Sequence, residues 1–415
     1  MNEIIRQLPK LKTGEELKQA LTVLPEYGKH ICEEDESIRL MALSDIYKIY
    51  LPSSMTTEIY SKVYLSMLRS LQKKNTKSAV MQRNENYRQI QNQSYRGIIG
   101  GSDSFTIIGN SGVGKSSAII GSIAVATDNL ILEIEHPYMR IIPCVICQCP
   151  HDCSVKGLLL EILRKVDEIL DSQYYEQAIR ARATTDMLIG CVSQVSLNHI
   201  GLLVVDEIQN VCNHRNGTNL VSMLTQLINN SGISICMVGT PESTKFFEKE
   251  MQLARRSLGL QYGALEYNEY FKYLCETVYQ YQYVRNRTEI SDMIIEWLYE
   301  HSSGLVSVVI SLIHDAQEIA IMTGKEVLNI ETLDIAYQER MKMLHGYIQP
   351  SILTKKQTTT KKKAEKKRKQ DKTEERETIQ RESVNLYELI MDGRKNGENI
   401  VELLKTYVSV LEVCV

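Results

Sequence analysis

The sequence lacks long hydrophobic runs: no stretch reaches the roughly eighteen apolar residues that a membrane-spanning helix requires. We also expect no secretory signal, because Met1-Asn2-Glu3-Ile4 provides neither a basic leader nor an apolar core. A membrane or secreted protein is therefore not supported, and we expect a cytoplasmic one. At 415 residues, with 43% hydrophobic and 24% charged residues, the chain has the composition of a globular protein of two or three domains.

The paired cysteine spacing of a structural zinc site is absent too, although the chain has ten cysteines. Cys144, Cys147, Cys149 and Cys153, with His151 among them, follow C-x₂-C-x-C-x₃-C rather than two separate C-x₂-C units. The first three fall in a strand-like run, where successive side chains point to opposite faces. We interpret these cysteines as small buried apolar residues, and an intracellular location argues against disulfides.

The net charge of −3 gives no indication of a polyanionic partner, but the charge is unevenly placed. Residues 355–372 contain ten Lys or Arg against two acids, with Thr and Gln between them. Such a segment is expected to be disordered or partly helical, and it can bind polyanions through counterion release. A solvated linker is an equally good interpretation of this segment taken alone.

The chain does have a phosphate-binding loop. Residues 109–116 read Gly-Asn-Ser-Gly-Val-Gly-Lys-Ser, which satisfies the pattern G-x-x-x-x-G-K-[ST]. A strand-like run, Phe105–Ile108, precedes the loop, and a helix-like run, Ser117–Ala126, follows it. Glycines let backbone N–H groups turn toward phosphates, and the helix adds the positive end of its dipole. We therefore predict a nucleoside triphosphate site.

The predicted ATP-binding residues are consecutive: Gly109, Asn110, Ser111, Gly112, Val113, Gly114, Lys115, Ser116 and Ser117. Two of them have specific roles in such loops. Lys115 is expected to reach the β- and γ-phosphates, and the Ser116 hydroxyl to complete the coordination of a Mg²⁺ ion.

A second strand-like segment, Gly201–Glu207, ends in two acids after four apolar residues. This pattern is typical of a buried parallel strand whose carboxyl end opens onto a ligand crevice. Asp206 is expected to hold Mg²⁺ through water, and Glu207 to orient and polarise the attacking water. A buried strand that ends in solvated acids is the alternative, which the phosphate loop makes less attractive.

A third apolar run, Ile233–Gly239, is followed by Thr240-Pro241-Glu242. In AAA+ ATPases a polar residue at this strand end, called sensor 1, contacts the γ-phosphate or its water. Thr240 suits that role, and an ordinary turn threonine is the alternative.

The alternation of strands and helices from Phe105 to Leu260 predicts a three-layer α/β domain with a parallel sheet. One helix is expected at Gln173–Val195. Residues 74–104 are rich in Asn, Gln, Arg and Gly and show weak periodicity; we expect part of the base pocket there. The predicted organisation is a helical N-terminal region (1–75), an AAA+ ATPase core (76–262), an α-helical lid (263–348), a basic linker (349–382) and an amphipathic tail (383–415). The tail suits a docking peptide or a simple surface helix.

Six segments carry a further pattern: Ile142–Pro150, Ser154–Leu159, Lys165–Asp167, Gly201–Asn210, Val238–Thr240 and Gln252–Arg256. Together they resemble the TnsC/TniB family of AAA+ ATPases, which regulate transposition. The resemblance covers residues from about 100 to 260. Its most specific parts are Asp-Glu-Ile-Gln-Asn at 206–210 and Ala-Arg-Arg at 254–256.

This resemblance implies a P-loop AAA+ fold and a mechanism. Family members bind ATP, assemble as rings or filaments on double-stranded DNA, and mark a target for a transposase together with a target-selecting protein. ATP hydrolysis then remodels the assembly. By analogy, Arg255 or Arg256 is the finger that enters the neighbouring subunit's nucleotide site. Surface ion pairs are the alternative, and the sequence does not distinguish the two arginines.

The lid departs from the wider AAA+ pattern, because residues 302–307 offer no arginine as a second sensor. Hydrolysis is therefore expected to be slow. Lys156, Arg164 and Lys165 are candidate DNA contacts, with a solvated helix face as the alternative. Two other functions would use the same ATP chemistry: a helicase loader or replication initiator, and a signalling ATPase of the NTP-switch type to which DNA is irrelevant.

Overall fold

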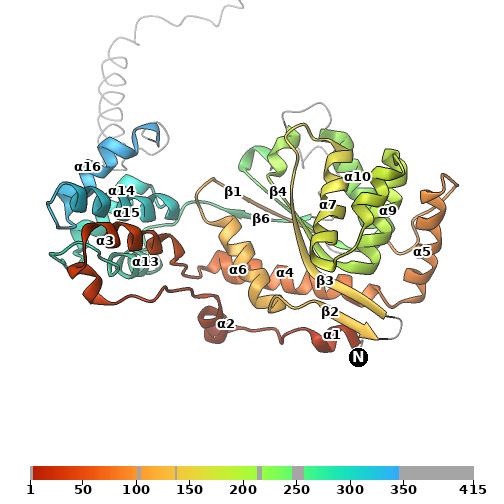
Figure 1. Ribbon diagram of the computed structural model, residues 1–415, viewed down its shortest axis with the longest axis horizontal. Coiled ribbons are helices and arrows are strands. Elements are labelled where there is room, and N and C mark those ends of the chain that lie inside the picture. The colour runs from red at the N-terminus through yellow and green to blue at the C-terminus, as the bar shows by residue number, and fades with distance from the viewer. Residues whose placement is uncertain (1–2, 101–103, 136–137, 213–216, 245–256, 345–415) are drawn as a thin grey trace, which may run out of the picture. The chain divides into compact units, whose positions relative to one another are not determined.

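The computed structural model describes residues 3–100, 104–135, 138–212, 217–244 and 257–344. In these ranges one six-stranded sheet has the order β2-β3-β4-β5-β1-β6 (Figure 1). The strands are β1 (Ser104–Gly109), β2 (Leu132–Glu135), β3 (Tyr138–Gln148), β4 (Ile200–Asp206), β5 (Ser234–Gly239) and β6 (Ser257–Tyr262). Because β4, β5 and β1 are adjacent and parallel, their carboxyl ends lie together at one edge of the sheet.

The predicted three-layer α/β domain is confirmed, but the sheet is mixed and not wholly parallel. β2 pairs antiparallel with β3, with Leu132 opposite Ile141. Only two residues separate these strands in the sequence, and such a short connection permits antiparallel pairing alone. The sequence prediction also omits β6, whose Ser-Leu-Gly-Leu-Gln-Tyr has no apolar run because it lies at the sheet edge.

Helices cover both faces of the sheet. One layer contains α7 (Val155–Leu170), α9 (Thr185–His199) and α10 (Gly217–Ser231); the other contains α1 (Glu3–Gln7), α2 (Gly14–Leu21), α4 (Ser54–Lys73) and α6 (Lys115–Thr127). Alternate residues of β4 enter opposite layers: Leu203 and Val205 the first, Leu202 and Val204 the second. The unbroken apolar run of β4 follows from this burial on both faces.

The single helix expected at Gln173–Val195 is in fact two helices, α8 (Tyr174–Arg180) and α9. Arg182, between them, has a φ of 46°, which a continuous helix does not allow. The Thr184 hydroxyl then caps α9 by accepting from the Met187 N–H. The local capping chemistry thus outweighs the continuous apolar spacing.

Residues Lys77–Ile90 form α5, a helix that the weak hydrophobic periodicity does not reveal. Its inner face is polar, with Gln82 and Asn86 fully buried. The Gln82 side chain accepts from the Ile98 N–H, and Asn86 donates to the Asn230 carbonyl. Hydrogen bonds to buried amides, in addition to apolar packing, therefore hold α5 in place.

The N-terminal segment packs on two different cores. α1, α2 and α4 lie against the sheet, whereas η1 (Lys29–Glu33), α3 (Glu36–Ala42) and η2 (Leu43–Lys48) lie against the lid helices. The chain leaves the sheet after α2 and returns before α4. The outgoing and returning passages pair at Val23 and Tyr50 through two backbone hydrogen bonds of 2.9 and 2.8 Å. We call residues 22–53 the strap.

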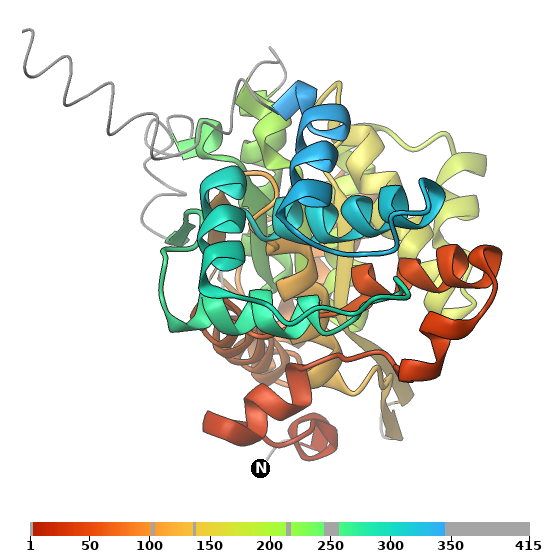
Figure 2. The ribbon, with the colours of Figure 1, turned by 90° about the vertical axis from the view of Figure 1, so that its left-hand side faces the viewer.

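The lid comprises α13 (Glu269–Tyr279), α14 (Asp292–Ser302), α15 (Val306–Met322) and α16 (Ile330–Arg340), followed by η5 (Lys342–Leu344). Figure 2 shows the strap, in red, beside the lid helices in teal and blue. Arg39 of the strap is 1% exposed and binds the Glu326 carboxylate through two hydrogen bonds of 2.7 Å. It also donates to the Tyr283 carbonyl at 3.0 Å. Core, strap and lid belong to one compact unit.

No single helix in the described ranges has the length and apolar composition to cross a membrane. α14 and α15 reach this length and composition only when taken together, and the pair is bent by 119°. Both helices contribute buried residues to the lid core.

Candidate nucleotide site

The predicted phosphate loop connects β1 to α6 at the carboxyl edge of the sheet. Gly112 and Gly114 have φ values of 82° and 93°, a left-handed conformation that favours glycine. At Gly109 an added Cβ would lie 2.7 Å from the Tyr262 carbonyl oxygen, so the backbone of β6 also requires a glycine there. Lys115 begins α6, whose N-terminus has no side-chain cap. Its first N–H groups are thus available to an anion.

Lys115 is held over the loop. Its Nζ donates to the carbonyls of Gly109 at 2.7 Å and Asn110 at 2.8 Å. Burial lowers the pKa of Lys115, and the nearby Asp206 and Glu207 carboxylates oppose that shift. The ammonium therefore has negative neighbours and carbonyl partners that a phosphate can replace.

The two predicted Mg²⁺ residues lie next to each other. Ser116 Oγ is 3.3 Å from Asp206 Oδ2, although ninety residues separate them in the sequence. A hydroxyl and a carboxylate are the hard oxygen ligands that Mg²⁺ prefers. This donor set fits the ion, which when bound neutralises phosphate charge.

Glu207 follows Asp206 at the end of β4 in a left-handed conformation, with a φ of 58°. Its N–H donates to Asp206 Oδ1 at 2.8 Å. The side chain of Gln209 donates to Glu207 Oε2 and also accepts from the Thr240 N–H at 3.3 Å. Gln209 is absent from the residues that sequence analysis singled out for a role, although it belongs to the Asp-Glu-Ile-Gln-Asn pattern.

Thr240, the predicted sensor at the end of β5, lines the same pocket as Lys115 and Glu207. Its Oγ1 is buried and has no hydrogen-bond partner among the described residues. A buried hydroxyl without a partner is costly, so a ligand oxygen or a water is expected beside it.

These residues line a pocket of about 960 Å³. The strap contributes Val23, Ile49 and Leu51, and the lid contributes Ser307 and Ile310. No described residue between 74 and 104 lines it, so the expectation that part of the base pocket lies there is not met. That segment instead forms α5, which packs against α9 and α10.

The lid touches the phosphate loop directly, even though it has no arginine at 302–307. The Ser307 N–H, in the first turn of α15, donates to the Gly112 carbonyl at 3.2 Å. The preceding turn is bound to the chain that leaves β6, since the Leu265 N–H donates to the Gly304 carbonyl at 2.9 Å. Loop, lid and connecting segment are therefore joined by backbone contacts.

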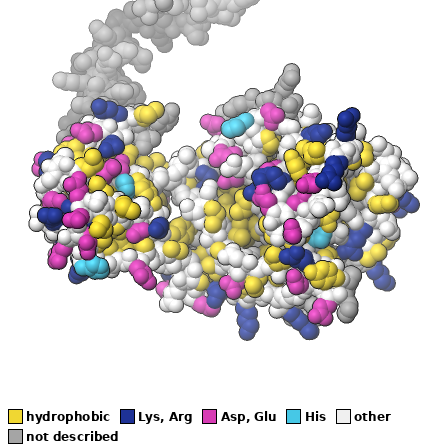
Figure 3. All heavy atoms as spheres, in the orientation of Figure 1, with side chains coloured by type: hydrophobic (Ala, Val, Ile, Leu, Met, Phe, Trp, Pro, Cys, Tyr) yellow, Lys and Arg dark blue, Asp and Glu magenta, His cyan; other side chains and the backbone are white. Residues whose placement is uncertain are grey.

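Arg255 and Arg256, the candidate finger residues, lie outside the described residues. The candidate DNA contacts on α7 are already engaged: Lys156 donates to the Ala183 carbonyl, Arg164 pairs with Glu161 and Glu168, and Lys165 pairs with Glu168. Figure 3 shows cationic and anionic side chains interspersed over the core on this face. These pairs agree with a solvated helix face.

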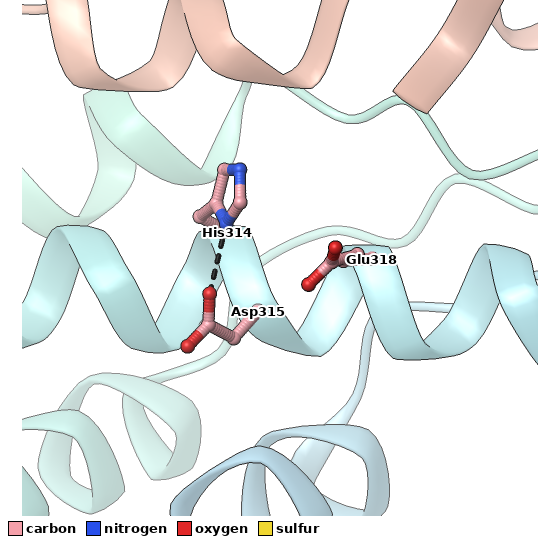
Figure 4. A group of neighbouring side chains, drawn as sticks. All are labelled: His314, Asp315 and Glu318. Carbon is pink, nitrogen blue, oxygen red and sulfur yellow. Dashed lines mark hydrogen bonds and ion pairs between the residues drawn. The ribbon is translucent and has the colours of Figure 1, made fainter. Parts of the chain in front are cut away.

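Of the four central cysteines, Cys147, Cys149 and Cys153 are buried and Cys144 is partly buried. Burial raises the pKa of both Cys147 and Cys149 to about 12, which leaves the thiols protonated. In the described ranges, the one group of three potential ligands whose atoms lie within 4.8 Å of one another is His314, Asp315 and Glu318 on α15 (Figure 4). Asp315 already pairs with His314 at 2.9 Å, and Glu318 with Arg340 at 3.5 Å, so we assign them to lid packing.

Residues 100–260 match the family model described as bacterial TniB protein. Residues 100–260 are thus similar to the TniB family over less than half of the chain. The matched region contains the phosphate loop, the acidic strand end and the sensor strand, and together with the lid helices it has the P-loop AAA+ fold.

No curated protein matches the chain. Among solved structures, the chain is similar to the Orc1 protein of Aeropyrum pernix in complex with DNA, with 13% identity and a TM-score of 0.41 over 63% of this chain and 64% of that one. It is also similar to a Walker-type ATPase of Pyrococcus abyssi, with 12% identity and a TM-score of 0.39 over 68% of this chain and 75% of that one. The chain thus spans less than two thirds of the length of the Orc1 protein.

Proposed function

We propose that the chain is an ATP-dependent regulator of DNA transposition that binds and hydrolyses ATP with Mg²⁺ and assembles as a homo-oligomer on duplex DNA. In this role it recruits a transposase and a target-selecting protein. The observation that carries the ATP chemistry is that Lys115, Ser116, Asp206, Glu207 and Thr240 line one pocket. The TniB match of residues 100–260 supports the role in transposition.

Each residue has a separate task in this proposal. Lys115 exchanges the loop carbonyls for phosphate oxygens, and Ser116 and Asp206 hold the metal ion. Glu207 accepts a hydrogen bond from the attacking water and orients it. Thr240 donates its unpartnered hydroxyl to the γ-phosphate or to that water. The ring or filament is completed by Arg255 or Arg256 of a neighbouring copy, and residues 355–372 add DNA affinity.

The proposal is tested by imaging the full chain with duplex DNA in negative stain, in the presence of ATP, a slowly hydrolysed analogue or ADP. We expect assemblies with ATP and the analogue and their loss with ADP. Glu207→Gln should prolong the ATP assemblies, because binding is kept while hydrolysis is lost. Assemblies that form equally well without nucleotide would contradict an ATP-dependent regulator.

The finger is tested by replacing Arg255 and Arg256 together with Ala. Losing an arginine finger costs about 10³-fold or more in turnover in related phosphoryl-transfer systems. We expect a loss of that order in the assembled protein, with ATP binding by the isolated chain unchanged. Equal losses of binding and turnover would point to a folding defect instead.

A further inference from the structure

Gln209 links the two strand ends on which the proposed hydrolysis depends. It lies half-buried in the short helix η3 (Ile208–Cys212) and lines the nucleotide pocket. Its Nε2 donates to the Glu207 carboxylate at the end of β4, and its Oε1 accepts from the Thr240 N–H at the end of β5. One amide thus contacts both the predicted base and the backbone of the predicted sensor.

The end of β5 is shaped to receive this amide. A Cβ added to Gly239 would lie 3.0 Å from Gln209 Oε1 and 2.8 Å from the Ile208 side chain. Both distances are shorter than ordinary van der Waals contacts, so any side chain at residue 239 would force Ile208 and Gln209 to shift. The contact between Gln209 and Thr240 is therefore part of the packing of the two strand ends.

The turn at Glu207 is strained and held from several sides. A glutamate in the left-handed region is strained, and this conformation persists only where its surroundings fix it. Here the Asn210 N–H donates to the Glu207 carbonyl at 3.1 Å, and the Asn210 side chain donates to the Cys149 carbonyl at 2.9 Å. Among the described residues, Gln209 provides the one hydrogen bond to the Glu207 side chain itself.

We propose that Gln209 is a positioning residue for ATP hydrolysis, an inference that rests on the proposed function. By donating to one carboxylate oxygen of Glu207, it fixes the side-chain rotamer and leaves the other oxygen for the attacking water. Because the same amide accepts from Thr240, a shift of the β5 end alters the position of Glu207. The two bonds need a donor and an acceptor at opposite corners of one side chain, which an amide supplies.

The test compares ATP binding with turnover in the full-length Gln209→Ala variant. The kcat should fall by roughly tenfold to 10²-fold, the scale at which a misplaced catalytic group costs rate, while the Kd for ATP changes less than about twofold. Gln209→Asn keeps the amide but is one methylene shorter, so it should lose kcat as well. Gln226→Ala, which removes a half-buried amide of α10, serves as the matched control and should retain both values.

The split between kcat and Kd separates positioning from general destabilisation. A destabilised pocket would weaken ATP binding together with turnover, whereas loss of the Gln209 contact to Glu207 should lower turnover alone.

The outcomes distinguish the two proposals. A wild-type chain without ATP turnover removes the proposed function, and the Gln209 role falls with it. An active wild type whose Gln209→Ala variant keeps its kcat within about twofold removes only the positioning role, as does a Gln209→Ala variant whose Kd for ATP rises as much as its kcat falls.

Discussion

The phosphate side and the lid side of the nucleotide pocket are built in different ways. The loop at 109–116 is one contiguous segment, Asp206 ends β4 and Thr240 follows β5, so each contribution follows directly from strand order. The lid side instead combines residues 22–53 with residues 263–311, which are more than two hundred positions apart. The chemistry of the site thus comes from short motifs at the ends of neighbouring strands, whereas its closure depends on packing between distant segments.

Lys115→Ala should have the largest effect and should separate the two sides. The substitution removes the ammonium that contacts the phosphates, so ATP binding should be abolished, as measured by calorimetry. The lid should remain folded, which the fluorescence of the single tryptophan, Trp297 of α14, reports directly. Lys18→Ala, which breaks an exposed pair with Glu15 on α2, is the control. Full ATP-dependent DNA assembly by Lys115→Ala would refute the site.

Arg39→Ala tests the lid side of the pocket, where the strap binds the lid. Removing one partner of a buried ion pair typically costs about 3 to 5 kcal/mol, because the other charge is left uncompensated. Arg39 is 1% exposed, and its removal takes away the charged partner of Glu326 and the Arg39 donor to the Tyr283 carbonyl. The Glu326 carboxylate keeps a hydrogen bond from the Arg285 N–H. We expect the lid to unfold at a lower urea concentration than in wild type, as monitored by Trp297 fluorescence. Arg180→Ala, which breaks an exposed pair with Glu176, should cost less than about 1 kcal/mol.

The sequence predicts the phosphate side of the pocket better than the lid side. The loop, the acidic strand end and the sensor strand could be located because each requires particular residue types next to an apolar run. The division of the N-terminal region between two cores could not be predicted. The sequences of α2, α3 and α4 indicate helices, but they do not show which core each helix packs against. α5 was missed because buried amides replace part of its apolar face, and Gln209 because its two partners meet only in the folded chain.

Acid should weaken the lid through Glu326. The Arg39 guanidinium lowers the pKa of Glu326 below its usual value, despite an opposing effect of burial. A carboxyl with a lowered folded-state pKa contributes stability above its unfolded pKa, near 4.3, and loses it as the pH falls through the folded-state value. The stability difference between wild type and Glu326→Gln should therefore shrink as the pH falls below about 4. An unchanged difference would contradict a charged contact.

Ser53→Ala should have the smallest effect, at the point where the strap returns to the core. The Ser53 hydroxyl accepts from the Thr56 N–H, and the Thr56 hydroxyl accepts from the Ser53 N–H, which caps α4 reciprocally. Loss of such a cap costs about 1 kcal/mol. Chemical denaturation should show that loss, whereas Ser54→Ala, at the neighbouring first helical position, should be nearly neutral. Equal effects would mean that the cap does not anchor the strap.

The central claim is tested most directly by a structure of Glu207→Gln with Mg²⁺, ATP and duplex DNA. The account predicts ATP between the loop and the lid, with its phosphates on Lys115, the metal ion on Ser116 and Asp206, and an arginine of a neighbouring copy beside the γ-phosphate. ATP bound elsewhere, or a metal ion that contacts neither Ser116 nor Asp206 directly or through water, would contradict it.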